Sequence, residues 1–202
     1  MKTEILPAAN LQRALDVLKT GGIVAFPTDT VYGLGAPAFD NPAIESIYAA
    51  KDRPIEKAIP ILIGDLSDLE KVAMNVPDMA LRFAARFWPG PLTCVIPKQP
   101  TLPPAVSATP TVAVRIPNHP DALALLRAAG PMAVTSANIS GAQSPTTAQE
   151  VYEQLNGRIP LILDGGRTPG GIPSTLVDCT GDKPVILREG PIALETLLAA
   201  LG

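Results

Sequence analysis

The sequence predicts an α/β fold in which helices pack on a twisted, mixed β-sheet. Apolar runs rich in β-branched residues alternate with helical patterns along the 202 residues. Some of these runs follow one another with only a loop between them, which favours a mixed sheet over a regular doubly wound one. The composition is 47% hydrophobic and 17% charged, as in globular proteins, and the length predicts a single domain over residues 1–202.

The first half of the chain is predicted to be mainly helical. Residues 10–20 have helical periodicity, with Asn10 as the N-cap and a Gly-Gly pair as the stop. Residues 23–26 form a buried strand, and a second helix starts at Pro42, because proline favours the first helical position. The other predicted elements are a strand at 58–63, a helix opened by a capping box of Ser67 and Glu70, and a helix at 78–87.

The second half is predicted to supply most of the strands. The runs 92–96 and 111–116 are rich in β-branched residues, which favour strands. A second capping box, Thr147 and Glu150, opens a helix that stops at 156–157. The other predicted elements are helices at 120–129 and 192–201 and strands at 132–135, 159–163, 175–177 and 185–187.

Polar motifs lie beside several of these elements. In open α/β sheets, ligands bind at the edge where strands end, so hydroxyls, amides and cations there predict a cleft for phosphate and carboxylate groups. The chain is therefore expected to be an enzyme or a binding protein. The motifs are FPTDTVYGLG (26–35), KDRP (51–54), VRIP (114–117), TSANISG (135–141) and STLVD (174–178).

Charge, cysteine content and hydropathy narrow the class of protein. A net charge of −3 and a pI near 5.2 argue against sequence-independent nucleic-acid binding over the whole surface. These values are still compatible with a local basic patch. Cys94 and Cys179 are expected to be free, buried thiols. The first residues contain no apolar leader and no run is long enough to span a membrane, so the expected location is cytoplasmic.

Several kinds of chemistry have no support in the sequence. The single histidine, His119, has no Gly-x-Ser-x-Gly elbow to accompany it, and no cluster of Cys and His predicts a protein metal site. Neither a P-loop nor a Gly-x-Gly-x-x-Gly motif follows a strand. The remaining cations, hydroxyls and amides suit phosphoryl or nucleotidyl transfer, where catalysis is mostly orientation and charge stabilisation.

Two motifs each allow a functional and a structural interpretation, and a third position, Arg115, is harder to explain by structure alone. Lys51 and Arg53 converge on one anion if the chain is extended there, or else they are ordinary cations at a helix C-terminus. Ser136 and Asn138 share one side of an extended chain, or belong to a turn. Arg115 interrupts an apolar strand, and a buried arginine requires an anionic partner.

Three further segments are ambiguous in the same way. Arg188 repeats the pattern of Arg115, and its structural alternative is a surface ion pair with Glu189. That pair is unfavourable on a strand, because neighbouring side chains point to opposite faces. Residues 28–30 belong either to the site or to a strand-ending turn with Gly33 and Gly35. The proline-rich stretch 97–110 is either a lid or, more simply, a surface loop.

In this order, the motifs closely resemble those of the YrdC/TsaC family, the threonylcarbamoyl-AMP synthases, over nearly the whole chain. WPGPLT (88–93) and LREG (187–190) belong to the same resemblance. It implies a YrdC-like (DHBP synthase-like) fold with a concave, positively lined cleft. It also implies that L-threonine, bicarbonate and ATP, with Mg²⁺, yield threonylcarbamoyl-AMP and pyrophosphate. A tRNA threonylcarbamoyl transferase complex would then accept the product.

The family motif implies a role for each matching residue. Lys51 and Arg53 resemble a clamp for phosphate and carbamate, and Ser136 and Asn138 resemble the pair that orients the α-phosphate. These four would be the catalytic residues. The implied ATP contacts are Arg53, Lys57, Ser136, Ser144 and Arg188, and the implied threonine contacts are Thr30, Arg115 and Ser174.

The sequence departs from the family pattern at two positions. Asp52 stands where the Lys-x-Arg motif often has glycine, so an acid lies beside the clamp or points to solvent. Leu62 stands where the family often has a histidine near threonine, which makes the pocket more apolar. The chain also ends soon after Arg188, so we expect it to lack the second domain of longer members.

Two other functions stay open at this stage. One is a non-catalytic tRNA-binding or double-stranded RNA-binding protein of the same fold, which the acidic pI and the 4% aromatic content disfavour. The other is a carbamoyl-adenylate domain of the hydrogenase-maturation type, which would use carbamoyl phosphate. Those domains lie in longer chains with zinc modules.

Overall fold

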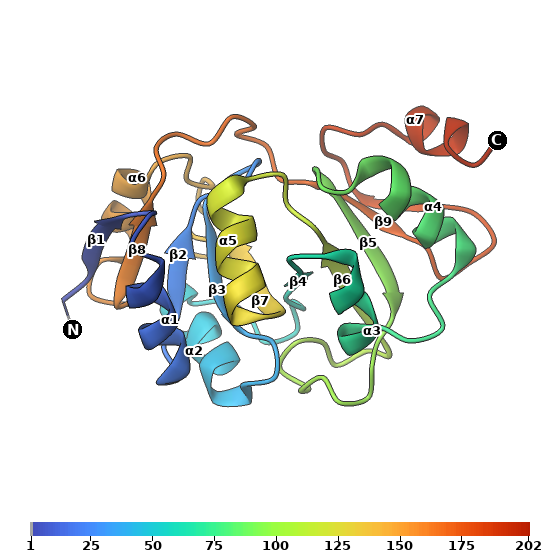
Figure 1. Ribbon diagram of the computed structural model, residues 1–202. Helices are drawn as coiled ribbons and strands as arrows, with labels where there is room; N and C mark the ends of the chain where they lie inside the picture. The colour runs from blue at the N-terminus through green and yellow to red at the C-terminus, as the bar shows by residue number, and fades with distance from the viewer. Residues whose placement is uncertain (1) are drawn as a thin grey trace.

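Ten strands join in one twisted sheet with the order β1-β8-β2-β3-β7-β4-β6-β5-β9-β10, in a computed structural model that describes residues 2–202 (Figure 1). The strands are β1 (Glu4–Pro7), β2 (Val24–Phe26), β3 (Gly33–Pro37), β4 (Ile61–Leu62), β5 (Leu92–Pro97), β6 (Thr111–Arg115), β7 (Met132–Ser136), β8 (Leu161–Asp164), β9 (Thr175–Asp178) and β10 (Val185–Arg188). Parallel and antiparallel pairs both occur, so the predicted mixed α/β sheet is confirmed.

Seven α-helices flank the sheet among the described residues. They are α1 (Leu11–Lys19), α2 (Asn41–Lys51), α3 (Leu69–Val72), α4 (Asp78–Phe87), α5 (Pro120–Ala129), α6 (Ala148–Leu155) and α7 (Leu194–Ala199), and a 3₁₀ turn (Leu66–Asp68) precedes α3. In residues 2–202 we find no helix of the length and apolarity needed to cross a bilayer.

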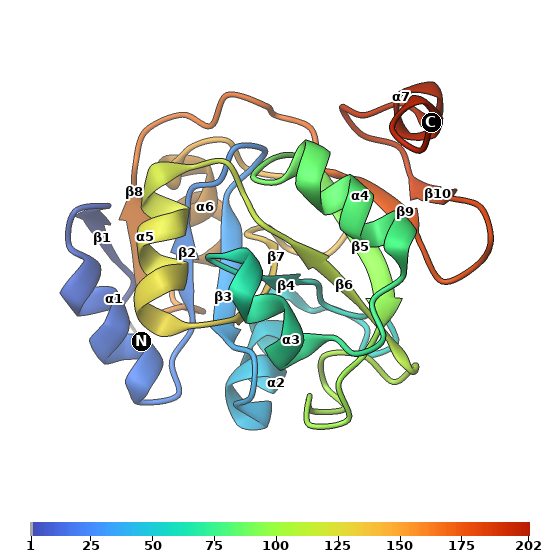
Figure 2. The same ribbon diagram turned by 45° about the vertical axis from the view of Figure 1, so that its right-hand side comes forward.

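Alternation along the strands divides the core between the two faces of the sheet. On β2, Val24 and Phe26 pack with α1 and α5, whereas Ala25 packs with the cluster that includes α2 and α6. Figure 2 shows α5 lying across the sheet beside α1. Helices therefore cover both faces of this half of the sheet, and all three of these β2 side chains are fully buried.

Two strands were not predicted, and β3 is the more informative of them. It is the sequence GLGAP, which lacks the β-branched residues typical of strands. A Cβ atom on Gly33 would come within 2.7 Å of Val134 Cγ1, and one on Gly35 within 2.9 Å of Met132 Cε. Because glycine has no Cβ, β3 can pack closely against β7. It lies between β2 and β7 in the sheet. The other missed strand, β1, lies at the edge of the sheet beside β8.

One of the two predicted capping boxes is wrong. Thr147 accepts a hydrogen bond from the Glu150 backbone N–H at 3.2 Å, as predicted for the start of α6. Ser67 instead lies inside the 3₁₀ turn, and neither N-cap of this region has a side-chain cap bond within the described chain. The predicted strand at 58–63 is also shorter, because only β4 pairs with its neighbours.

The proline-rich stretch after β5 is not a plain surface loop. Leu102, Ala105 and Val106 are buried, and the Ile59 N–H donates to the Val106 carbonyl at 2.9 Å. The Tyr48 hydroxyl donates to the Ala105 carbonyl at 2.9 Å. These contacts anchor the stretch to the core, so it forms a fixed wall beside the sheet.

Candidate active site

A cavity of about 510 Å³ lies where the polar motifs meet. Its walls come from the segment after β2, the segment between α2 and β4, strands β5, β6 and β7, and the segments around β9 and β10. The volume is within the usual range for small-molecule sites. Residues from position 28 to position 188 therefore contribute to one site, which covers one face of β5 and β6 as well as strand ends of the kind that the sequence predicted.

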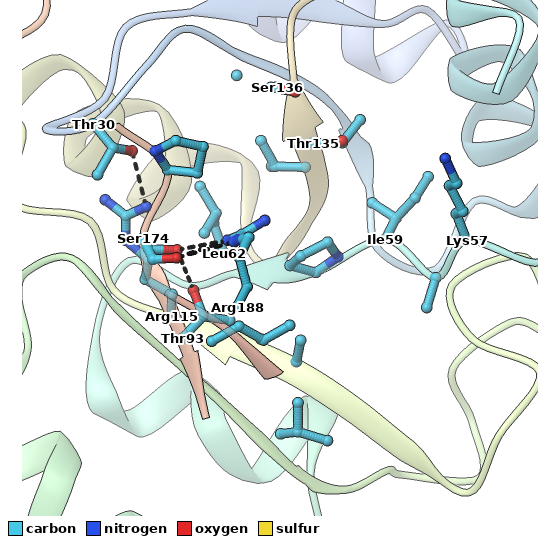
Figure 3. A pocket seen from close by; sticks show the side chains of 18 of the residues that line it. Thr30, Lys57, Ile59, Leu62, Thr93, Arg115, Thr135, Ser136, Ser174 and Arg188 are labelled. Atoms are coloured by element: carbon cyan, nitrogen blue, oxygen red, sulfur yellow. Dashed lines mark hydrogen bonds between the residues drawn. The ribbon is translucent and has the colours of Figure 1, made fainter. Parts of the chain in front are cut away.

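One end of the cavity is built around Arg115, which ends β6 and is only 5% exposed (Figure 3). Its Nε donates to the Gly90 carbonyl at 2.9 Å, and its Nη1 donates to Thr30 Oγ1 at 3.1 Å. Its Nη2 donates to Asp29 Oδ1. The anionic partner predicted for a buried arginine is therefore Asp29. Burial lowers the pKa of Arg115, and Asp29 opposes that shift.

Hydroxyl groups and a second arginine complete this end. Thr93 Oγ1 and Ser174 Oγ, both buried, are 2.7 Å apart. Arg188 donates to the Ser174 carbonyl through Nε at 3.2 Å and Nη2 at 2.9 Å, and from Nη2 to Ser174 Oγ at 3.2 Å. Figure 3 shows Thr30, Arg115, Ser174 and Arg188 together at this end. The alternative surface pair of Arg188 with a neighbouring glutamate does not form.

Positive charge gathers along the cavity without carboxylates on its wall. Arg53, Lys57, Arg115 and Arg188 line it, and among the described residues no Asp or Glu does. Burial and the charge of Arg53 lower the pKa of Arg188, and burial lowers the pKa of Arg53. A cavity that gathers cations without carboxylates on its described wall favours an anionic ligand.

Lys51 and Arg53 do not converge. Lys51 is 1% exposed, and its Nζ donates to the backbone carbonyls of Ser136, at 2.5 Å, and Asn138. Arg53 turns the other way, and its Nε donates to the Lys57 carbonyl at 3.1 Å. Lys51 is absent from the cavity wall, whereas Arg53 lies on it. Of the two residues expected to form a clamp, Arg53 therefore lies on the cavity wall, and Lys51 holds the backbone of Ser136 and Asn138.

The predicted pair Ser136 and Asn138 is divided in the same way. Ser136 ends β7 and lines the cavity, but Asn138 does not. The Asn138 Nδ2 donates to the carbonyls of Ile139 and Ala142 at 2.8 and 2.9 Å, which closes the turn after β7. Ser144 is also outside the lining, although the carbonyl of the next residue, Pro145, accepts the N–H of the lining residue Tyr32 at 2.9 Å.

The acidic residue in the Lys-x-Arg motif faces away from the site. Asp52 is the C-cap of α2 with φ 50° and ψ 42°, a left-handed conformation that glycine adopts most easily. Its Oδ2 accepts from Arg158 Nη1 at 2.7 Å. This backbone conformation suits the glycine that the motif resemblance leads us to expect at the position, and the carboxylate pairs with Arg158 outside the cavity lining.

Several hydroxyl residues of the cavity received no individual role from the sequence. Thr28, Thr93 and Thr135 line it, and so do Ser107, Thr109 and Thr111. The last three form a chain, with Oγ distances of 2.9 Å and 3.0 Å between successive hydroxyls. Their spacing of two residues could have indicated one polar face, but the prolines around them suggested a surface loop. Leu62 lines the cavity as well, so its wall is apolar at that position.

Comparison with known proteins identifies the family. A family model described as "Telomere recombination", covering Sua5, YciO and YrdC proteins, matches residues 16–190. The chain belongs to the Sua5/YciO/YrdC family. The resemblance drawn from the motifs is thereby confirmed, since the match includes all of the segments that carried it.

Individual family members show how far the likeness extends. The threonylcarbamoyl-AMP synthase of Bacillus subtilis is 46% identical over 195 residues, which are 95% of this chain and 56% of the relative. Sua5 of Pyrococcus abyssi, solved with L-threonine, has 42% identity and a TM-score of 0.95, covering 99% of this chain and 61% of that one.

A third similar protein, YciO of E. coli, has 28% identity and a TM-score of 0.86. The match covers 96% of this chain and 99% of YciO. The fold is thus shared with solved members of the family. The chain spans about 56% of the length of the Bacillus subtilis relative and the full length of YciO.

Proposed function

We propose that this protein is a threonylcarbamoyl-AMP synthase, which forms threonylcarbamoyl-AMP and pyrophosphate from L-threonine, bicarbonate and ATP. The observation that supports the proposal is one cavity lined by Arg115, which lies beside two hydroxyls, and by three further cations, Arg53, Lys57 and Arg188. The curated Bacillus subtilis relative has this activity in its name, and the Sua5 structure was solved with L-threonine. Both support the assignment.

The threonine end would use the groups around Arg115. Arginine binds a carboxylate through two parallel N–H···O bonds, and Arg115 is buried beside the hydroxyls of Thr30 and Ser174. The threonine amine joins bicarbonate, and water leaves, to give a carbamate. A closed pocket raises the effective concentration of this short-lived nucleophile and protects it from water.

ATP would be bound by Arg53, Lys57 and the Ser136 hydroxyl at the end of β7, and by Arg188, which would contact the phosphates from its place beside Ser174. A carbamate oxygen attacks the α-phosphorus, the bond to the β-phosphate oxygen breaks, and pyrophosphate leaves with the electron pair. Cations fixed on the wall stabilise the charge that develops on the phosphate oxygens. Lys51 and Asn138 would act indirectly, by holding the segment that contains Ser136. Ser144 would contribute to the ATP site through its neighbour Pro145, whose carbonyl accepts the Tyr32 N–H.

The residues around the cavity do not form a cage for Mg²⁺. Among residues 2–202 no cluster of three metal-ligating side chains occurs, and the cavity wall is made of hydroxyls and cations. Mg²⁺ commonly reaches such sites through substrate phosphates and water. We therefore propose that Mg²⁺ enters as part of the substrate Mg·ATP.

Three broader features belong to the same proposal. The product would pass to a tRNA threonylcarbamoyl transferase complex, with at most weak contact between tRNA and this chain, in the cytoplasm. Residues 1–202 would act as one domain, which the single ten-stranded sheet supports. A single cooperative unfolding transition by two spectroscopic probes is the test of that last point.

The deciding experiment measures pyrophosphate release from Mg·ATP, with threonine and bicarbonate each omitted in turn. The proposal requires release that depends on both. Arg53→Ala should abolish it in a protein that stays folded, whereas Arg82→Ala should not, because Arg82 donates to the Leu201 carbonyl away from the cavity. Release without either co-substrate, or no release from folded protein, would contradict the proposal.

The competing functions give different results in the same assay. A carbamoyl-adenylate domain would release pyrophosphate with carbamoyl phosphate in place of threonine and bicarbonate. A non-catalytic RNA-binding protein would bind tRNA in a salt-sensitive way without ATP turnover. No observation on the cavity or in the family comparisons favours that last function.

A further inference from the structure

Asp29 forms a buried ion pair with Arg115 behind the cavity wall. The side chains of Arg115 and Asp29 are 6% and 10% exposed. Arg115 lines the cavity, but Asp29 does not. A carboxylate in this place would not touch a ligand in the cavity, yet it contacts a guanidinium that lies on the cavity wall.

The donors of Arg115 are shared between the protein and the cavity. Arginine has five N–H donors in a rigid planar fork. Protein groups within the described chain accept three of them: the Gly90 carbonyl from Nε, Thr30 Oγ1 from Nη1, and Asp29 Oδ1 from Nη2. One N–H therefore remains on each terminal nitrogen. Where both of these donors lie on the edge shared by Nη1 and Nη2, they form the bidentate pattern that a carboxylate accepts.

We propose that Asp29 is a positioning residue that fixes the guanidinium of Arg115, so that its two remaining N–H groups face the carboxylate of the amino-acid substrate. This inference rests on the proposed function. The three protein acceptors come from two segments, Gly90 from one and the adjacent residues Asp29 and Thr30 from the other, so the fork is held from both segments. Asp29 is the one acceptor among them that carries a charge, and it neutralises Arg115 before the substrate arrives.

The surroundings of Asp29 keep it in place. A Cβ atom on Gly170 would lie 2.7 Å from the Asp29 carbonyl oxygen, so the segment after β8 packs tightly against the Asp29 backbone. The Gly171 N–H donates to the Thr30 carbonyl at 2.8 Å. This segment then continues to Ser174 in the cavity wall. The same backbone contacts therefore hold Asp29 in place and help to position the Ser174 hydroxyl in the cavity wall.

Charge repulsion gives Asp29 a further effect. Arg188 lies near enough to Arg115 to lower its pKa, so two guanidinium groups compete at one end of the cavity. Without the Asp29 carboxylate, Arg115 would be repelled by Arg188 and would lose the acceptor on Nη2. The fork would then turn away from its productive plane, and threonine binding would weaken while the ATP end stayed intact.

The test compares Asp29→Asn and Asp29→Ala with wild type. Asparagine keeps the shape and one acceptor but removes the charge, so it guards against loss of folding in the alanine variant. The matched control is Asp65→Ala, since Asp65 pairs with Arg127 at 2.9 Å on the surface and neither residue lines the cavity. L-threonine binding is titrated calorimetrically without ATP, and KM for threonine, KM for ATP and kcat are measured by pyrophosphate release.

We expect Asp29→Ala to weaken threonine binding by roughly 10- to 100-fold, the range for one charge-assisted hydrogen bond, and Asp29→Asn to weaken it by less. KM for ATP should stay unchanged. Unchanged threonine binding in folded Asp29→Asn and Asp29→Ala would overturn the inference, and so would equal losses at the threonine and ATP ends. Wild type that binds threonine but releases no pyrophosphate would contradict the proposed function alone. Wild type that does not bind threonine would remove the basis of both.

Discussion

At the scale of single residues, Lys51 is unusual because a lysine side chain is almost fully buried there. Its amine lies among buried groups at the end of α2, and burial together with the charge of Arg53 lowers its pKa to about 7. A neutral amine still has two N–H donors, which are enough for the carbonyls of Ser136 and Asn138. The residue therefore connects the helix to the segment after β7 without requiring a charge.

This pKa predicts how stability depends on pH. In the unfolded chain Lys51 keeps its ordinary pKa of 10.5, so between pH 7 and 10.5 the unfolded state binds the extra proton. Stability contributed by this group therefore rises with pH across that window, by up to about 1.4 kcal/mol per pH unit, and is flat outside it. Denaturant unfolding of wild type and Lys51→Met from pH 6 to 10 measures the difference. Parallel curves for the two proteins would show that Lys51 is charged in the folded state.

At the scale of elements, β3 shows what sequence patterns cannot predict. Glycines normally weaken strands, so a run with two of them gave no strand signal. The reason for them lies in β7, where side chains of Met132 and Val134 occupy the space that a Cβ would need. That neighbour is distant in sequence, and periodicity carries no information about it.

Filling this space should destabilise the protein. Gly35→Ala places a methyl group 2.9 Å from Met132 Cε and 3.1 Å from Val134 Cγ2, and overpacking of that kind costs about 1–3 kcal/mol. Gly181→Ala is the matched control, because a Cβ there meets nothing within 4 Å, and it should change stability by less than about 0.5 kcal/mol. Urea unfolding of both variants gives the two values. A cost for Gly35→Ala as small as that of the control would mean that β3 and β7 separate easily.

The helices were easier to predict than the strands, for a physical reason. The bounds of α4 and α5 follow directly from local periodicity and from the prolines and glycine beside them. Strand pairing is non-local, so β1 and β3 were missed and the predicted strand before residue 64 was too long. The same distinction applies to the capping boxes, since only the one at Thr147 had a long helix to cap.

At the scale of the whole molecule, the site exists only because the sheet brings distant segments together. The motifs indicated which segments would meet, and Thr30, Arg115, Ser174 and Arg188 do line one cavity. They could not indicate which side chains face it. The direction of Lys51 depends on carbonyls 85 and 87 positions away, and that of Asp52 on a contact 106 positions away.

The collected cations predict how ATP binding responds to salt. Arg53, Lys57 and Arg188 face one cavity that has no carboxylate on its described wall, so a polyanion is attracted by their summed field. Salt screens that attraction, and each cation adds to the steepness of the dependence. The Kd for ATP should therefore rise with NaCl, and Arg53→Ala should bind ATP more weakly but with a shallower salt dependence. Arg82→Ala serves as the control of equal charge change, because Arg82 contacts the Leu201 carbonyl near α7 and should keep the wild-type slope. Equal slopes for all three proteins would mean that hydrogen bonding at fixed geometry, and not the field of the cavity, holds the triphosphate.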